Sequence, residues 1–220
     1  MTADGLERAF RGQLVALGAS LFGRRLTFGR TGNLSVRVSD HLLVTPTGSS
    51  LGGLDPGQMA MVGMDGSHLG GAAPSKEAFL HTAMYRARPQ AGAVVHLHST
   101  YAVAVSCLAG TDPDDVLPPL TAYYAMRVGR LPLLPYHAPG DPALGPLAER
   151  AAAHHHALLL ANHGPIVAAA DLPAAADAIE ELEETAKLFL LLHGQAIRPL
   201  TDDQAGRLRA RAEAEAKETR

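Results

Sequence analysis

Short apolar segments typical of β-strands alternate with longer amphipathic segments along the whole chain, and this alternation constrains the fold more than any other feature. The clearest helix is expected over 173–193, beginning at Pro173 and ending at Gly194. Strands are expected over 35–38, 42–45, 59–62, 91–97, 131–135, 157–161 and 166–170, and helices over 4–22, 75–88, 100–108, 124–128, 142–153, 173–193 and 201–218. This order predicts an α/β or α+β fold in which helices cover a sheet.

Composition indicates a globular protein with no polyanionic partner. Lysine and arginine number 19 against 22 acidic residues, a formal net charge of −3, which leaves no basic footprint for nucleic acid or an anionic membrane. The single cysteine, Cys107, excludes an internal disulfide and indicates a reducing compartment. With no signal peptide and no long apolar run, a cytoplasmic location is expected. We expect a single domain over 1–220, with the helix at about 201–218 peripheral to it.

Histidines are unusually frequent, and two of them share one predicted strand. Residues two apart on a strand point to the same face, so His96 and His98 would converge on one point. Imidazole nitrogens suit Zn²⁺ or a similar divalent cation, and His163, at a predicted turn between strands, is a candidate third ligand. The alternative is two ordinary polar residues on an exposed face. His137 lies in a Pro/Gly-rich loop of a kind that often lines pockets.

Three turns rich in small residues and hydroxyls are candidates for binding an anion. They are Gly32-Asn33-Leu34-Ser35, Thr45-Pro46-Thr47-Gly48 and Ser75-Lys76-Glu77. Small residues allow close backbone approach, and N–H and O–H groups donate to phosphate oxygens. The alternative is that glycine and threonine simply form turns here, and Ser75 is also a plausible helix N-cap.

The ordered set GNLS, TPTG, PSKE, HLHS, NHG and ELEETAKLFLLL, from about residue 10 to 195, resembles the class II aldolase/adducin family. That resemblance implies a three-layer αβα fold with a central, mainly antiparallel sheet, assembled as a homotetramer. It implies Zn²⁺, or another divalent transition metal, held by three histidines and Glu77, which also serves as the catalytic acid/base. The implied histidine ligands are His96, His98 and His163, and the implied phosphate-binding residues are Gly32, Asn33, Thr47, Gly48 and Ser75.

Two departures from the sugar aldolases point to one branch of that family. Lys76 replaces a second phosphate-binding serine and adds a positive charge for a substrate that is a dianion or has two anionic ends. The stretch LPPLTAYYAMRVG is closer to the branch that decarboxylates a 3-oxo-tetronate 4-phosphate to dihydroxyacetone phosphate. The alternatives are a phosphate-sugar aldolase or epimerase, and a non-catalytic adducin-like module. No role is assigned to Tyr123 or Tyr124.

Overall fold

The centre of the molecule is one eight-stranded sheet. A computed structural model describes the backbone of residues 3–218 and the side chains of residues 5–212, 214 and 215. The strand order is β4-β3-β2-β1-β5-β8-β7-β6, and every neighbouring pair is antiparallel except β6 with β7. The strands are β1 (Asn33–Val38), β2 (His41–Val44), β3 (Ala60–Gly63), β4 (His68–Gly70), β5 (Ala93–His96), β6 (Leu133–Leu134), β7 (Ala157–Leu160) and β8 (Gly164–Ala169).

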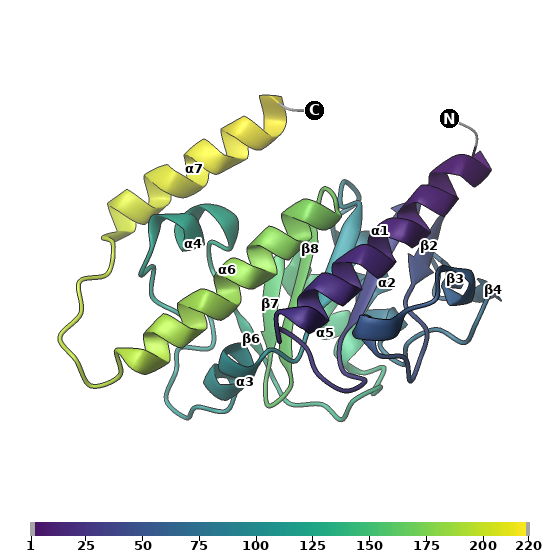
Figure 1. Cartoon of the computed structure of the whole chain (residues 1–220). Coiled ribbons are helices and arrows are strands. Elements are labelled where there is room, and N and C mark those ends of the chain that lie inside the picture. Colours follow the sequence, from purple (N-terminus) through teal and green to yellow (C-terminus); the bar gives the residue numbers. More distant parts are fainter. Residues whose placement is uncertain (1–2, 219–220) are drawn as a thin grey trace.

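Helices cover both faces of this sheet (Figure 1). They are α1 (Ala3–Gly23), α2 (Ala78–Ala87), α3 (Thr100–Ser106), α4 (Ala122–Arg127), α5 (Leu144–Ala152), α6 (Leu172–Leu191) and α7 (Asp202–Glu218), with short 3₁₀ turns at Leu51–Gly53 and Pro56–Gln58. One buried apolar cluster joins a sheet face to α1, α3, α4 and α6. A second cluster joins the other face to α2 and α5, and α7 packs against α4. The three-layer, mainly antiparallel architecture expected from the resemblance is therefore confirmed.

The middle of the sheet brings distant parts of the sequence together. Within the ladders, Asn33 of β1 pairs with His96 of β5, and His96 pairs with Ile166 of β8. β5 ends at His96, and its antiparallel neighbour β8 begins at Gly164. The residues just after β5 and just before β8 therefore lie at the same end of these two strands. Within residues 3–218, no helix is long and apolar enough to cross a bilayer.

Two local expectations were wrong. The strand expected over 91–97, with His96 and His98 together at its end, spans Ala93–His96, so His98 lies in the loop before α3. The helix expected from Ser75 begins at Ala78 with Glu77 in the N-cap position. The Ser75 hydroxyl accepts a hydrogen bond from the Glu77 backbone N–H at 3.3 Å, which forms a turn before the helix rather than its cap.

Candidate metal centre and substrate cleft

Four side chains that can ligate a metal converge beyond the end of β5. The ligand atoms of Glu77, His96, His98 and His163 all lie within 4.8 Å of one another. The three imidazole ring centroids are 4.6–5.0 Å apart, with interplanar angles of 66–89°. Among the described residues, this is the one group of three or more such side chains placed closely enough to hold an ion. The sheet therefore assembles the histidines singled out in the sequence.

The environment of His96 fits a metal ligand. Its Nδ1 lies 2.8 Å from the carbonyl oxygen of Pro165, and since a carbonyl can only accept, Nδ1 carries the proton. The other nitrogen, Nε2, is buried, lies 3.3 Å from Glu77 Oε2 and lacks a partner in hydrogen-bonding geometry. A ring fixed by a backbone carbonyl, with its second nitrogen aimed at an anionic cluster, is the usual arrangement of a metal-binding histidine.

The backbone around His163 explains the sequence Asn-His-Gly. Asn162 has a φ of 56°, a left-handed conformation that asparagine tolerates better than most residues. Gly164 approaches the segment that follows β5 so closely that a Cβ there would lie 2.3 Å from the carbonyl oxygen of Leu97. This turn places His163 Nε2 at 2.9 Å from Glu77 Oε1 and 3.0 Å from His98 Nε2.

Glu77 carries the negative charge of the cluster. Burial acts to raise the pKa of its carboxyl group, but the charge of His96 and a hydrogen bond with His163 outweigh burial and hold that pKa well below its usual range. Burial and the neighbouring His96 and His163 lower the pKa of His98 to about 3. Burial also opposes the charged form of His96, yet attraction to Glu77 raises its pKa, so a proton and a metal compete for Nε2. A carboxylate and neutral imidazoles are the forms that ligate metals.

A buried chain of hydrogen bonds holds Glu77 from behind. Glu77 can only accept, so Asn33 turns its amide nitrogen toward Oε2 at 2.8 Å and its Oδ1 toward His81 Nε2 at 2.5 Å. His81 Nε2 therefore donates, and Nδ1 accepts from the Ser35 hydroxyl at 2.6 Å. Burial, the field of His96 and the weaker opposing field of Glu77 set the pKa of His81 at about 3, which keeps the ring neutral. Sequence reasoning assigned His81 no functional role, although it lies one helical turn after Glu77.

A pocket of about 180 Å³ borders the cluster and gathers the predicted anion-binding turns. All six predicted residues line it, namely Gly32, Asn33, Thr47, Gly48, Ser75 and Lys76. Gly32 has a φ of 78°, and a Cβ there would lie 3.0 Å from the His96 carbonyl oxygen, which explains the glycine. Sequence reasoning missed Arg30 and Ser49, which also line the pocket. An arginine two residues before the Gly-Asn pair was the available signal for Arg30.

A wider pocket of about 390 Å³ lies on the other side of the cluster. Its walls are Phe28, His98, Thr100, Val103, Tyr136, His137, Pro139, Asn162 and His163. His98 and Pro139 line both pockets, so the two form one cleft with the metal-ligand set between them. His137 lies in this wall, as expected from its loop. Tyr123 and Tyr124 line neither pocket: Tyr124 is buried in the core and Tyr123 is 60% exposed.

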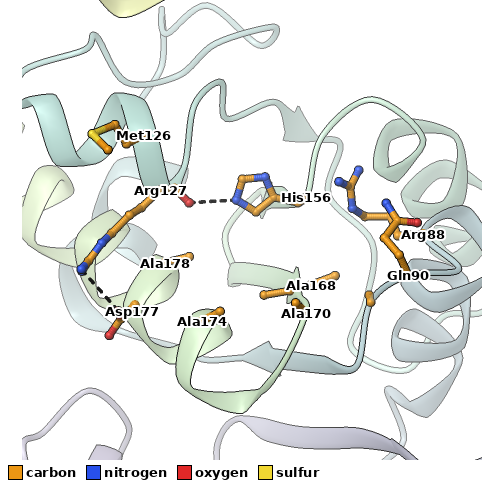
Figure 2. Close-up of a pocket in the computed structure, with 12 residues that line it drawn as sticks. Arg88, Gln90, Met126, Arg127, His156, Ala168, Ala170, Ala174, Asp177 and Ala178 are labelled. Carbon is orange, nitrogen blue, oxygen red and sulfur yellow. Dashed lines mark hydrogen bonds and ion pairs between the residues drawn. The ribbon is translucent and has the colours of Figure 1, made fainter. Parts of the chain in front are cut away.

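A further pocket of about 310 Å³ lies at the opposite end of β8 (Figure 2). Alanines of β8 and α6 form much of its wall, and Arg127 at its rim is paired with Asp177 at 3.3 Å. His156 Nε2 points to the carbonyl oxygen of Arg127, 2.9 Å away. Arg127, Asp177 and His156 are engaged with one another there, and Arg88 donates to the carbonyl oxygen of Ala152 at 3.0 Å. The metal-ligand set lies at the other end of β8.

The cleft, the metal-ligand set and the sheet together define a class of protein. The chain belongs to the class II aldolase and adducin family, whose model, the Class II Aldolase and Adducin N-terminal domain, matches residues 12–190.

Individual relatives give a finer comparison. The 3-oxo-tetronate 4-phosphate decarboxylase of Haemophilus influenzae is 52% identical over 192 residues, which cover 87% of this chain and 91% of the relative. The L-fuculose phosphate aldolase of Methanocaldococcus jannaschii is 32% identical over 179 residues, covering 81% of this chain and 94% of the relative. The crystal structure of YgbL from Escherichia coli matches with a TM-score of 0.90 at 45% identity, over 93% of this chain and 99% of that one.

Proposed function

We propose that this protein is a metal-dependent carbon–carbon lyase that decarboxylates 3-oxo-tetronate 4-phosphate to dihydroxyacetone phosphate and CO₂. The observation that carries the proposal is the Glu/His₃ cluster placed between two halves of one cleft, one of them lined by phosphate-type donors. Identity of 52% to a decarboxylase of that name, over most of both chains, supports the substrate.

The proposed metal is Zn²⁺, or another divalent transition metal, held by Glu77, His96, His98 and His163. Three imidazoles and a carboxylate are a donor set that zinc accepts, and the orphaned, buried Nε2 of His96 is the feature of the chain that fits it best. When bound, such a metal supplies Lewis-acid stabilisation of negative charge developing on the substrate's ketone and hydroxyl oxygens.

The protein's own residues bind the substrate and handle its proton. Backbone N–H groups and hydroxyls of the three turns, with Lys76 and Arg30 beside them, would hold the phosphate. Loss of CO₂ leaves an electron pair at C2, which takes up one proton to give dihydroxyacetone phosphate. Glu77 is the proposed carrier of that proton. Because its lowered pKa keeps the carboxylate ionised, it must acquire the proton from solvent in each turnover.

The test is direct. Protein loaded with Zn²⁺ is incubated with 3-oxo-tetronate 4-phosphate, and both CO₂ and dihydroxyacetone phosphate are assayed. We expect the two products in equal amounts. No CO₂ release, together with cleavage of fuculose 1-phosphate, would replace the proposal with an aldolase, the second candidate favoured by the 32% identity to L-fuculose phosphate aldolase.

A non-catalytic, adducin-like role has a separate signature. Elemental analysis of the purified protein would find no bound transition metal, and added metal would restore no activity. The intact ligand cluster is the observation that weighs against this role.

A further inference from the structure

The cleft has two chemically different ends, and the proposed function accounts for only one. The smaller pocket carries Lys76, Arg30 and the small-residue turns, which suit a phosphate. The wider pocket carries Phe28, Val103 and Pro139 on its apolar walls. A four-carbon substrate whose phosphate occupies the first pocket, and whose middle carbons lie at the metal ligands, extends its other end into the second. That end is the carboxylate that leaves as CO₂.

His137 is the imidazole side chain of the wider pocket that is not in the metal-ligand set. The Nδ1 atom of His137 is 2.9 Å from Asp141 Oδ2. This hydrogen bond is the main reason that the pKa of the Asp141 carboxyl group is lowered. A carboxylate at low pKa only accepts, so Nδ1 carries the proton. Nε2 has no hydrogen-bond partner among the described residues, and the ring is about one-fifth exposed.

The loop that carries His137 is anchored through Asp141 and passes close to Lys76. Asp141 Oδ1 accepts the backbone N–H of Ala143 at 2.9 Å, just before α5. Gly140, with a φ of 84°, lies against Lys76, since a Cβ at this glycine would be 3.6 Å from the Lys76 Cβ. Pro139 lines both pockets. The imidazole is therefore pre-oriented, which reduces the entropy lost when it binds a ligand.

We propose that His137 in its doubly protonated form binds the carboxylate of the substrate through Nε2–H while Nδ1–H stays on Asp141, and that Asp141 is the residue that positions it. This inference rests on the proposed function and adds to it a determinant of specificity. The hydrogen bond would select phosphorylated keto acids over phosphorylated ketones. It would also orient the C1–C2 bond so that CO₂ departs into the wider pocket.

The experiment compares two phosphorylated ligands that differ in the carboxylate. Erythronate 4-phosphate carries it and has no ketone to decarboxylate, whereas dihydroxyacetone phosphate lacks it. Their dissociation constants are measured by calorimetry on the zinc-loaded full chain and on His137→Phe, which keeps a ring and removes the donor. Loss of a hydrogen bond to a charged group corresponds to about 10- to 100-fold weaker binding of erythronate 4-phosphate. Dihydroxyacetone phosphate should change by less than about 2-fold on the same argument.

Further variants separate the role of His137 from damage to its loop. His137→Gln, whose amide still donates a neutral hydrogen bond, should recover part of the lost affinity, and Asp141→Asn should fall between wild type and His137→Phe. His68→Phe, on the edge strand β4, is the matched control and should bind both ligands like wild type. Equal losses for the two ligands, or no loss for either, would overturn the inference while wild type still released CO₂. A wild-type protein that binds neither ligand and releases no CO₂ would instead remove the proposed function, and this inference with it.

Discussion

At the scale of single residues, Glu77 is the side chain on which the proposed chemistry most depends. Both of its oxygens are engaged, Oε1 with His163 and Oε2 with Asn33, and it lies at the N-terminal end of α2. A residue with this many fixed neighbours keeps its position when its charge is removed. Substitutions there therefore separate the chemistry of the carboxylate from its contribution to structure.

Glu77→Gln should slow turnover far more than it weakens metal binding. The amide is nearly isosteric and the three histidines remain, but it cannot carry a proton to carbon. We expect kcat to fall by about 10²- to 10⁴-fold, with zinc content near the wild-type value. Steady-state kinetics and elemental analysis of the same preparation test this. Full activity in the variant would refute the acid/base role.

His96→Ala should lower the zinc stoichiometry. The substitution removes the buried Nε2 and leaves the carbonyl oxygen of Pro165 with the Leu97 backbone N–H as its donor. Zinc per chain is measured after dialysis against a weak chelator, with His68→Ala as a control outside the cluster. Unchanged stoichiometry would exclude His96 from the ligand set.

His81 should make the protein sensitive to mild acid. The pKa of His81 is about 3 in the folded protein, against an ordinary 6.5. Between these two pH values the unfolded chain binds a proton at His81 and the folded protein does not. Stability from this group is complete above pH 6.5 and is lost as the pH falls toward 3. The loss reaches about 2 kcal/mol by pH 5.

Urea unfolding of wild type and His81→Gln at pH 7.5 and pH 5 measures that loss. The difference in unfolding free energy between the two proteins should shrink by this amount, because other titrating groups cancel. A difference that stays constant with pH would show that His81 is not held neutral.

At the scale of elements, the sequence patterns located most helices and strands but not every residue's place in them. The His-x-His pair was expected on one strand, yet β5 ends at His96 because Leu97 and His98 turn toward α3. The partners of Glu77 were also hidden. Asn33, Ser35 and His81 meet only because β1 lies beside β5 under α2, a pairing that no local pattern contains. Glu183, whose oxygens accept the N–H groups of Tyr101 and Ala102 at the start of α3, was missed for the same reason.

The close contact between the turn at Gly164 and the end of β5 predicts a costly substitution. In Gly164→Ala the new methyl group meets the Leu97 carbonyl oxygen at 2.3 Å, so the backbone leading to His98 must move. We expect a loss of about 1–3 kcal/mol in stability and reduced zinc content. Gly12→Ala, in α1 with open space around it, is the control and should be neutral or stabilising. Wild-type melting temperature and zinc content in Gly164→Ala would contradict this reading of the turn.

At the scale of the whole molecule, assembly remains a proposal from the family resemblance. Several large apolar side chains are exposed on the isolated chain, among them Phe28, Tyr123, Tyr136 and Leu191 at 58–68%. Phe28 and Tyr136 also line the wider pocket. Covering them in an assembly would remove apolar surface from water and close the cleft further.

Light scattering after size-exclusion chromatography tests the homotetramer. We expect a mass four times the 23.0 kDa of one chain. Substituting Tyr123 and Leu191, which lie outside both pockets, by serine should shift the mass downward if those side chains are interfacial. A wild-type mass of 23.0 kDa would rule the tetramer out.

The division of the cleft at His98 and Pro139 has a consequence for divergence. The metal ligands come from the end of β5, the turns beside it and the start of α2, whereas His137, Pro139 and Asp141 come from one connecting loop between β6 and α5. In a duplicated protein, replacement of that loop could change which group is preferred at the far end of the substrate. The metal-binding residues would stay as they are. Because the residues that bind the metal and those at the far end of the substrate come from different segments, substrate preference can change without loss of the metal.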